Sequence, residues 1–364
     1  MVRVPFFQNP YEDEDIKLVV DCLKSDWVTS LGPKTEEFEY AFSKYLGISH
    51  SIAVSSCTAG LDLALKALKG WYNVGDNVLL PSFTFHSDAD VIVQNGAIPN
   101  FVDIDEYTFN IADDLEYRIN DKSRGVILTH YAGQLADMEQ ICEICNQHNL
   151  FLIEDCAHIL GGGAGTFGDI NVFSFNSTKP LSTLQGGMVV TNYGKSADKI
   201  RLLRNHNISS ALNREHNWQY DVEEPGYNYC ITEMQAALGL SQLSKVEKNN
   251  WERITKATYL TELLHNIKGI ITPISKFYHN YHLYTIRVTK DYPLTRDELY
   301  LHLKKNGIDT SIKYIPIHHF SYYKKYANNL PVTDKVAEEV LCLPIYANIE
   351  YRQLEYVAEV IKNV

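Results

Sequence analysis

Short apolar runs alternate with amphipathic stretches through the first two thirds of the chain. Between the runs, apolar residues recur at helical spacing, as at Leu61, Leu65 and Leu68, and predict helices. The runs themselves predict strands, at residues 51–54, 78–81, 98–105, 125–130, 150–155, 170–175 and 188–191. Strands that alternate with helices are typical of a mostly parallel sheet covered on both faces, so the pattern predicts an α/β fold.

Further helices are predicted by apolar spacing and by capping signals. Residues 11–25 read as a helix with Ile16, Val19, Val20 and Leu23 on one face. The pattern Thr232-x-x-Gln235 is a capping box that opens another helix. Before it, residues 200–230 are long, polar and aromatic, and we interpret them as a helix followed by an extended loop.

The pattern changes near residue 246. A helix is predicted over residues 249–264, a strand at 282–289 and a strand at 308–315, with a capped helix between the two strands and a last helix at 350–361. This mixture predicts a smaller α+β domain. We therefore expect a large domain at residues 1–245 and a small C-terminal domain at residues 246–364.

Composition narrows the class of protein. The chain has 364 residues, of which 45% are hydrophobic and 21% charged, and its formal net charge is −12. Because the charge is negative and no basic block is present, a nucleic-acid partner is not expected. No apolar run reaches membrane-spanning length, and the N-terminus lacks a signal-peptide core. The expectation is a soluble cytoplasmic protein without a membrane partner.

The seven cysteines do not resemble a disulfide framework, because they are scattered and odd in number. Cys142 and Cys145 form a C-x-x-C pattern with His148 three residues on. A zinc site needs a fourth ligand and usually a second ligand pair. Since the trio lies in a helical stretch, the cysteines are interpreted as part of its apolar face, and no metal is expected.

Candidate chemistry gathers after the ends of predicted strands. Lys179 lies in a polar turn between two apolar runs, and Asp155 ends another run. A lone lysine in a loop is usually just solvated, but pyridoxal 5′-phosphate (PLP) needs a lysine for its Schiff base and a carboxylate for its ring nitrogen. Strand ends are where ligands bind in such sheets. The residues at or after strand ends are Thr58, Phe85, His130, Asp155 and Ser174.

The segment from SIAV to the helix AGLDLALKALK joins a strand to a helix through a small polar turn. Such a turn is a ready anion site, because free backbone N–H groups and the positive end of the helix dipole face one point. The alternative is an ordinary helix cap by Thr58.

With these elements placed, the chain resembles the DegT/DnrJ/EryC1/StrS family of sugar aminotransferases over nearly its whole length. The family has the aspartate-aminotransferase-like fold and uses PLP. The motifs that carry the resemblance, in order, are WVTSLGPKTEEFE, SSCTAGLDLAL, PSFTF, GAIPNFVDID, HYAGQLADM, IEDCAH, TFGDINVFSFNSTKPL, QGGMVVT, GYNYCITEMQAALGLSQL, HLYTIRV and GIDTSIKYIPIH.

The resemblance implies cofactor-binding roles. Lys179 would form the Schiff base with PLP and move the proton. Asp155 would bind the protonated ring nitrogen, and a nearby carboxylate favours that charged form. His158 would lie near the ring oxygen, and Phe85 would stack on the ring face. The phosphate would be held by Thr58, Ala59 and Ser174, as in the family.

Further roles concern the partner subunit and the substrate. The resemblance implies that Asn228 reaches the phosphate of the partner subunit's cofactor, so the active unit would be a homodimer. Thr29, Tyr314 and His318 would contact the substrate. The alternative for the IPIHH segment is that His318 and His319 pack at the domain interface.

Three positions depart from the family's pattern. Gln185 stands where the family usually has glutamate, Cys230 where it has arginine and Asn207 where it has glycine. The segment ILGGGAGTF is also shorter and richer in glycine. The missing arginine at Cys230 puts in doubt how a carboxylate or phosphate is held there.

The implied function is transfer of an amino group from glutamate to C4 of a 4-keto-6-deoxy sugar on a nucleoside diphosphate, in deoxyamino-sugar biosynthesis for polysaccharides such as O-antigen. HYAGQLADM and GIDTSIKYIPIHHFSYY most resemble the branch that acts at C4. A first alternative is a sugar dehydratase of the same family, but those enzymes carry histidine where Lys179 stands. A second alternative is a non-catalytic PLP-binding relic with a regulatory role.

Overall fold

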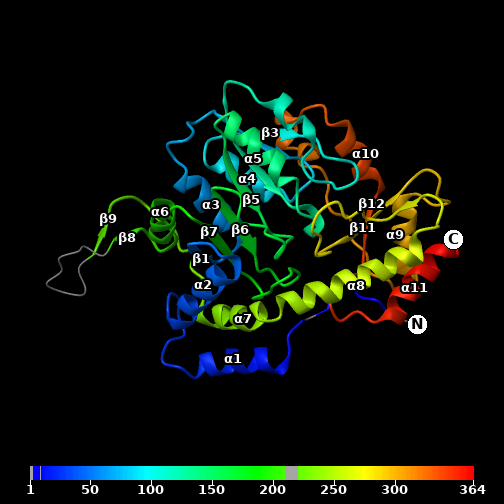
Figure 1. Ribbon diagram of the computed structural model, residues 1–364, viewed down its shortest axis with the longest axis horizontal. Coiled ribbons are helices and arrows are strands. Elements are labelled where there is room, and N and C mark those ends of the chain that lie inside the picture. Colours follow the sequence, from blue (N-terminus) through cyan, green and yellow to red (C-terminus); the bar gives the residue numbers. More distant parts are fainter. Residues whose placement is uncertain (1–2, 9, 210–219) are drawn as a thin grey trace.

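A computed structural model describes residues 3–8, 10–209 and 220–364 (Figure 1). Its centre is a seven-stranded sheet of order β1-β7-β6-β5-β4-β2-β3, in which β7 runs antiparallel to both neighbours and the other pairs are parallel. The strands are β1 His50–Val54, β2 Asn77–Pro81, β3 Ile98–Val102, β4 Ser123–Thr129, β5 Phe151–Asp155, β6 Ile170–Ser174 and β7 Gly187–Thr191. The predicted α/β class with a mostly parallel sheet is confirmed.

Helices cover both faces of this sheet, which is why its strands read as nearly continuous apolar runs. One face packs against α3 Cys57–Ala67, α4 Ser87–Gln94 and α6 Gly194–Arg204. The other packs against α2 Pro33–Leu46, α5 Met138–Gln147 and α7 Glu233–Leu243. The predicted capping box opens α7, where the Thr232 hydroxyl accepts from the Gln235 backbone N–H and the Gln235 side chain accepts from the Thr232 backbone N–H.

The C-terminal part forms a second layer of structure beside the sheet. Its elements are α8 Val246–Leu264, β10 Ile270–Ile271, β11 Tyr284–Val288, α9 Arg296–Lys305, α10 Pro331–Glu339, β12 Val340–Leu343 and α11 Tyr351–Lys362. β11 pairs antiparallel with β10 and β12. The predicted division after residue 245 falls between α7 and α8. Two segments pack with the part of the chain on the other side of this boundary. Val4 packs in the C-terminal core, and Ile317 and Leu330 pack in the core of the large sheet.

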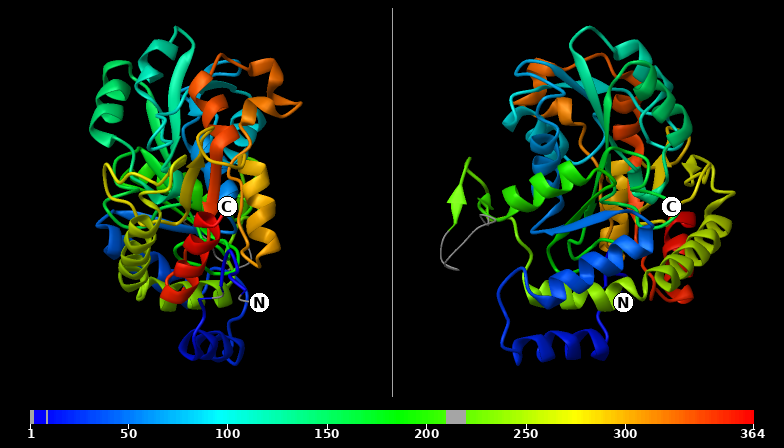
Figure 2. Two further views of the ribbon diagram at one scale, coloured as in Figure 1. Left: turned by 90° about the vertical axis from the view of Figure 1, so that its right-hand side faces the viewer. Right: turned by 60° about the vertical axis from the view of Figure 1, so that its left-hand side comes forward.

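The first helix, α1 Asp13–Leu23, lies along the outside of α7 (Figures 1 and 2). Its buried residues are Asp15 and Cys22, whereas its apolar residues Ile16 and Leu23 are more than half exposed. In the long segment before α7, the pair β8 Ile208–Ser209 and β9 Asp221–Val222 extends away from the body next to α6 (Figure 2). Residues 210–219 of the predicted extended loop lie outside the described residues.

The strand predicted at residues 308–315 is wrong. Only two isolated bridges occur there, Val4 with Ile308 and Ser311 with Cys342. In this segment Ile308 packs in the C-terminal core, while Lys313 and Tyr314 face a cleft. α10 and β12, which follow this segment, were not predicted. Short 3-10 turns complete the chain at Asp113–Arg118, Tyr131–Gly133, Ile317–His319 and Tyr323–Tyr326.

Two further expectations concern the cap of α3 and the C-x-x-C cysteines. The N-cap of α3 is Ser56, whose hydroxyl accepts from the Ala59 N–H, so the alternative of a cap by Thr58 is wrong. The C-x-x-C cysteines lie on α5 and pack in an apolar cluster, as expected for its buried face. Within the described residues, no helix is long and apolar enough to cross a membrane.

Candidate active site

A cleft of about 420 Å³ opens at the carboxyl ends of β5 and β6. The ends of β5 and β6, the N-terminal turn of α3 and the loop after β6 form one wall, the sheet wall. Residues 312–314 form the opposite wall. Its lining includes seven of the predicted site residues: Thr58, Phe85, Asp155, His158, Ser174, Lys179 and Tyr314. Segments up to 258 residues apart in sequence, from Ser56 to Tyr314, therefore meet around one cavity, as the topology of parallel strands favours.

Lys179 is one of two lysines that line the cleft. It lies in the turn after β6, where its N–H donates to the Asn176 carbonyl at 2.9 Å, and its side chain is half-buried. Burial and the nearby charge of Lys313 lower the pKa of Lys179 to about 8. A substantial fraction of this amine is thus neutral near physiological pH, as a lysine that attacks a carbonyl requires.

Asp155 lies at the end of β5 and is 3% exposed. Its Oδ1 accepts from the Ala157 N–H at 2.8 Å and from the Cys57 thiol at 3.5 Å. Burial raises the pKa of Asp155, and the Ala157 N–H and the charge of Lys179 oppose that rise. The site thus offers a buried carboxylate that gains from a cationic partner.

The cleft reaches the start of α3. Thr58 is in the first turn and Ser174 ends β6, and both line the cleft. A helix N-terminus offers free N–H groups and a positive dipole end to an anion. Ala59 does not line the cleft, because it is buried and its N–H donates to Ser56.

His158 and Tyr314 join the two walls. His158 Nδ1 accepts from the Ala132 N–H at 3.2 Å, and its Nε2 lies 2.8 Å from the Tyr314 hydroxyl. Burial, aided by the charges of Lys179 and Lys313, holds the pKa of His158 well below its usual range. The ring is therefore neutral, and Nε2–H donates to Tyr314, whose own proton is left to donate into the cleft. The Phe85 ring, 49% exposed, lies near Tyr314 with centroids 6.2 Å apart.

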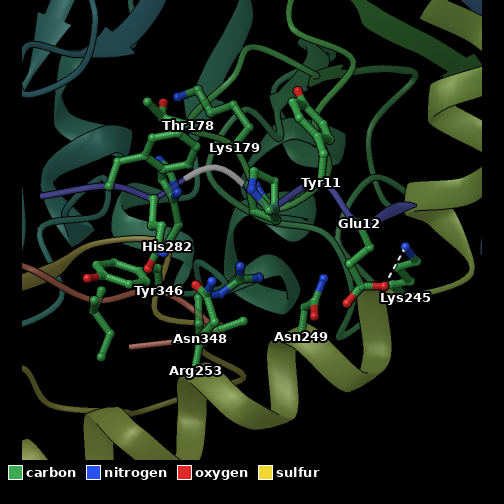
Figure 3. Close-up of a pocket in the computed structure, with 16 residues that line it drawn as sticks. Tyr11, Glu12, Thr178, Lys179, Lys245, Asn249, Arg253, His282, Tyr346 and Asn348 are labelled. Atoms are coloured by element: carbon green, nitrogen blue, oxygen red, sulfur yellow. Dashed lines mark ion pairs between the residues drawn. The ribbon is translucent and has the colours of Figure 1, made fainter. Parts of the chain in front are cut away.

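A smaller cavity of about 160 Å³ lies on the other side of Lys179 (Figure 3). Asn249 and Arg253 reach it from α8, and Lys245, just before that helix, pairs with Glu12 at 2.8 Å. Arg253 donates to the Asn280 carbonyl at 3.2 Å. This second cavity was not predicted, because most of its lining comes from the N-terminal segment, from α8 and from residues 345–348, none of which carries one of the motifs recognised in the sequence.

Three further residues named from the sequence, Thr29, Asn228 and His130, do not line the cleft. Thr29 is exposed, and its carbonyl accepts from the Glu233 N–H at 2.8 Å. Asn228 is also exposed and forms a bridge with Asn205. His130 is buried against Glu154, with 2.9 Å between Nε2 and Oε2. None of the three lines the cleft, and the roles of Thr29 and Asn228 stay predictions.

His318 is buried rather than open to the cleft. Its Nδ1 lies 2.7 Å from the Ser82 hydroxyl, and its Nε2 lies 3.0 Å from Asp334. His319 Nε2 lies 2.8 Å from the same Asp334 oxygen. Since the Ser82 hydroxyl also accepts from the His318 backbone N–H, this network ties residues 316–319 to the end of β2. A substrate contact by His318 stays a prediction.

The departures from the family's pattern have structural counterparts. Gln185 lines the cleft and accepts from the Asn176 side chain at 3.0 Å. Asn207 has a positive φ of 54°, a conformation that favours glycine and that asparagine tolerates. The Cys230 thiol lies 3.5 Å from the Arg204 carbonyl. Sequence reasoning missed Cys57 and Lys313 in the cleft, since neither stands out from its neighbours by residue type.

Comparisons with known proteins point to one family. The sequence model described as the DegT/DnrJ/EryC1/StrS aminotransferase family matches residues 10–362. The spore coat polysaccharide biosynthesis protein SpsC of Bacillus subtilis is 37% identical, over 96% of this chain and 94% of that protein. GDP-perosamine synthase of Vibrio cholerae is 30% identical, over 99% of this chain and 98% of that protein.

Solved structures show the same fold. PseC of Helicobacter pylori, an aminotransferase of pseudaminic acid biosynthesis, has a TM-score of 0.93 at 25% identity, over 99% and 98% of the two chains. The PLP form of a putative sugar aminotransferase of Streptococcus pneumoniae has a TM-score of 0.90 at 26% identity, over 100% and 98%. A GDP-4-keto-6-deoxymannose-3-dehydratase has a TM-score of 0.94 at 22% identity, over 99% and 100%, which shows the fold alone.

Proposed function

Because the chain belongs to the DegT/DnrJ/EryC1/StrS aminotransferase family, we propose that it transfers an amino group from glutamate to C4 of a nucleotide-linked 4-keto-6-deoxy sugar. Its cofactor is PLP, on which this family depends. One observation carries the proposal: a lysine whose pKa is lowered to about 8 shares a cleft with a buried carboxylate and the N-terminus of a helix.

The residues of the cleft fit PLP. Lys179 offers an amine for its aldehyde carbon, and buried Asp155 gains from a cationic ring nitrogen. Thr58 and Ser174 offer donors for the phosphate at the start of α3, and Phe85 offers a ring face. Each chemical group of the cofactor thus has a complementary side chain in one cavity of about 420 Å³.

When bound, PLP supplies an electron sink that stabilises negative charge on a carbon next to the amine. The protein's part is proton transfer and placement. Neutral Lys179 would take the proton from the α-carbon of glutamate; the amino group would stay with the cofactor, and water would supply the keto oxygen of 2-oxoglutarate, the first product. In the second half-reaction the same amine would deliver a proton to C4 of the sugar, whose keto oxygen would leave as water. Because both substrates use the same cleft in turn, we expect ping-pong kinetics.

The choice of C4 follows from which ring carbon the anchored nucleotide places at the reacting position. Two observations support it. GDP-perosamine synthase, a relative at 30% identity, is named for the nucleotide-linked sugar GDP-perosamine, and the sequence motifs resemble the C4 branch. The wall formed by Lys313 and Tyr314 offers a cation and a hydroxyl for the acceptor.

The test offers matched 3-keto and 4-keto-6-deoxy nucleotide sugars with glutamate and locates the new C–N bond by NMR. We expect the 4-keto substrate to be preferred. Preferential turnover of the 3-keto sugar would overturn the position of transfer but not the transaminase chemistry. Loss of the C3 oxygen without amine transfer would indicate that the protein is a sugar dehydratase of the same family. If glutamate were not converted to 2-oxoglutarate, the protein would be a non-catalytic PLP-binding relic.

We further propose that the enzyme is a homodimer with shared active sites. α1 presents Ile16 and Leu23, 56% and 55% exposed, on one uncovered face, and exposed apolar faces of this kind are typical of interfaces. Asn228 is exposed and does not line its own chain's cleft, as expected of a residue that serves the partner's cofactor.

Mixed dimers test this arrangement. Lys179→Ala is mixed with an inactive Asn228→Ala variant, and subunit exchange between the two is confirmed before activity is measured. Each mixed dimer should regain one intact site, so activity should return to about a quarter of the wild-type value if exchange is statistical. Mixtures that stay inactive would contradict shared sites.

A further inference from the structure

A second carboxylate lies directly behind the cleft. Asp88 is in the first turn of α4 and is fully buried, yet it does not line the cavity. Its Oδ2 accepts from the Thr129 hydroxyl at 2.9 Å and from the Thr84 hydroxyl at 3.3 Å. Thr129 ends β4 and is the register partner of Asp155 on β5. Through this pairing the side chains of Asp88 and Asp155 come into hydrogen-bond contact.

Two buried carboxylates in contact cannot both carry a charge, because repulsion at short distance is severe where water is excluded. The other titratable groups near the pair are Lys179, from the turn after β6, the Cys57 thiol, from α3, the Cys156 thiol, just after β5, and the Tyr314 hydroxyl, from residues 312–314. Among the described residues, no cationic side chain pairs with Asp88. The dipole of α4 favours a charge on Asp88, but this effect is weaker than repulsion between touching carboxylates.

The proton has a preferred place within the pair. Burial and the charge of Asp155 raise the pKa of Asp88 well above its usual range. The pKa of Asp155 is also raised by burial, but the Ala157 N–H and the charge of Lys179 favour its ionised form. Burial and the two neighbouring carboxylates raise the pKa of Cys57, so its thiol is a neutral donor.

We propose that Asp88 is a positioning residue that stays protonated at neutral pH and donates a hydrogen bond to Asp155. Asp155 then carries the pair's single negative charge and accepts from Cys57, Ala157 and Asp88. These donors fix the orientation of the carboxylate and leave its charge for the protonated ring nitrogen of PLP. The link to PLP rests on the proposed role of Asp155, whereas the protonation of Asp88 does not.

The first test needs no cofactor and no substrate. Infrared spectra of the cofactor-free protein at pH 7.5 should contain the carbonyl band of a protonated carboxylic acid, and Asp88→Asn should remove it. Asp90→Asn is the matched control, because Asp90 lies two residues on in the same helix and contacts His86 at 2.6 Å. The band should persist in this control. Absence of the band in the wild type, or its survival in Asp88→Asn, would overturn the proposal.

The second test measures PLP binding in variants of similar size. Asp88→Asn keeps a neutral donor toward Asp155, so the dissociation constant of PLP should stay within about twofold of the wild type. Asp88→Leu removes the donor, and loss of a hydrogen bond to a charged group should weaken PLP about tenfold or more. The ¹⁵N shift of labelled PLP reports whether its ring nitrogen stays protonated.

Thermal unfolding of the cofactor-free variants separates positioning from packing. If Asp88→Asn weakened PLP as much as Asp88→Leu at equal stability, donation by a neutral group would be disproved. If neither substitution changed the PLP affinity or the ¹⁵N shift, Asp88 would have no positioning role. If the wild-type protein bound no PLP while the infrared band behaved as expected, the proposed function would be wrong. The inference that Asp88 is protonated would still hold.

Discussion

Asp155 and Ser174 stand at the ends of neighbouring strands of the large sheet, whereas Lys313 and Tyr314 face them from a segment that belongs to no strand. The first wall is held by backbone ladders whose residues are almost all buried. The second is held mainly by side chains: the Tyr131 hydroxyl donates to the Lys313 carbonyl, and His158 donates to Tyr314.

This difference separates two tasks. A carboxylate that must meet a cofactor atom at a fixed distance needs the rigid wall, because its position is set by the cooperative sheet. Residues of a wall that is held by a few side-chain hydrogen bonds can be substituted without disturbing the sheet. Such a wall is therefore suited to recognise the acceptor sugar. We therefore expect substitutions in the sheet wall to abolish chemistry, and substitutions in the opposite wall to shift pH dependence or affinity.

The largest effect is expected from Lys179→Ala. Removing the amine removes both the attachment of PLP and the proton carrier, so kcat should fall by about 10³-fold or more. Borohydride reduction of the wild-type holoenzyme, followed by peptide mapping, should find PLP on Lys179, and no stable adduct should form in the variant.

Lys276→Ala, at an exposed lysine, is the control and should behave as the wild type. The informative competitor is Lys313, because it is the second lysine that lines the cleft. PLP reduced onto Lys313 in the wild type would reverse the assignment of the two walls.

The sheet wall was largely predictable from sequence. Runs such as LFLIED are apolar almost throughout because both faces of the strand are buried, and the rule for parallel strands then places Asp155 and Ser174 at one edge. Resemblance to the family then selected Lys179 among the lysines. The alternative of a cap by Thr58 was wrong because Ser56, two residues earlier, is an equally suitable hydroxyl residue and caps α3.

The opposite wall was not predictable in the same way. Residues 308–315 mix apolar and polar side chains as a half-buried strand does, but here Ile308 packs in a core while the consecutive residues 312–314 line the cleft. Asp88 was missed for a related reason. An acidic residue in the first turn of a helix is ordinary, and only the fold brings it beside Asp155.

A smaller effect is expected from Lys313→Met. Burial is the main reason that the pKa of Lys179 is lowered to about 8, and the charge of Lys313 is the next. Without that charge the pKa of Lys179 should rise, so less of the amine is neutral below pH 8. The rate of amine labelling of Lys179 at pH 7 should then fall by about three- to tenfold, measured by mass spectrometry on cofactor-free protein.

Lys313→Arg should restore the wild-type labelling profile, because it restores the charge. Lys335→Met is the control, since Lys335 pairs with Glu106 outside the cleft at 3.1 Å. A profile of Lys313→Met that moved to lower pH, or did not move, would show that the second wall leaves the chemistry of the first untouched.

The smallest effect is expected from Tyr314→Phe, which removes one hydroxyl and leaves the ring. His158 then loses the acceptor for its Nε2–H, which should lower the free energy of unfolding by about 1 kcal/mol. The acceptor sugar loses one neutral hydrogen bond, so its KM should rise about fivefold while kcat changes less. Tyr117→Phe, at a side chain that is 89% exposed, should change neither quantity. If kcat fell instead and KM stayed constant, Tyr314 would act in proton transfer with Lys179, and the division of tasks between the two walls would have to be abandoned.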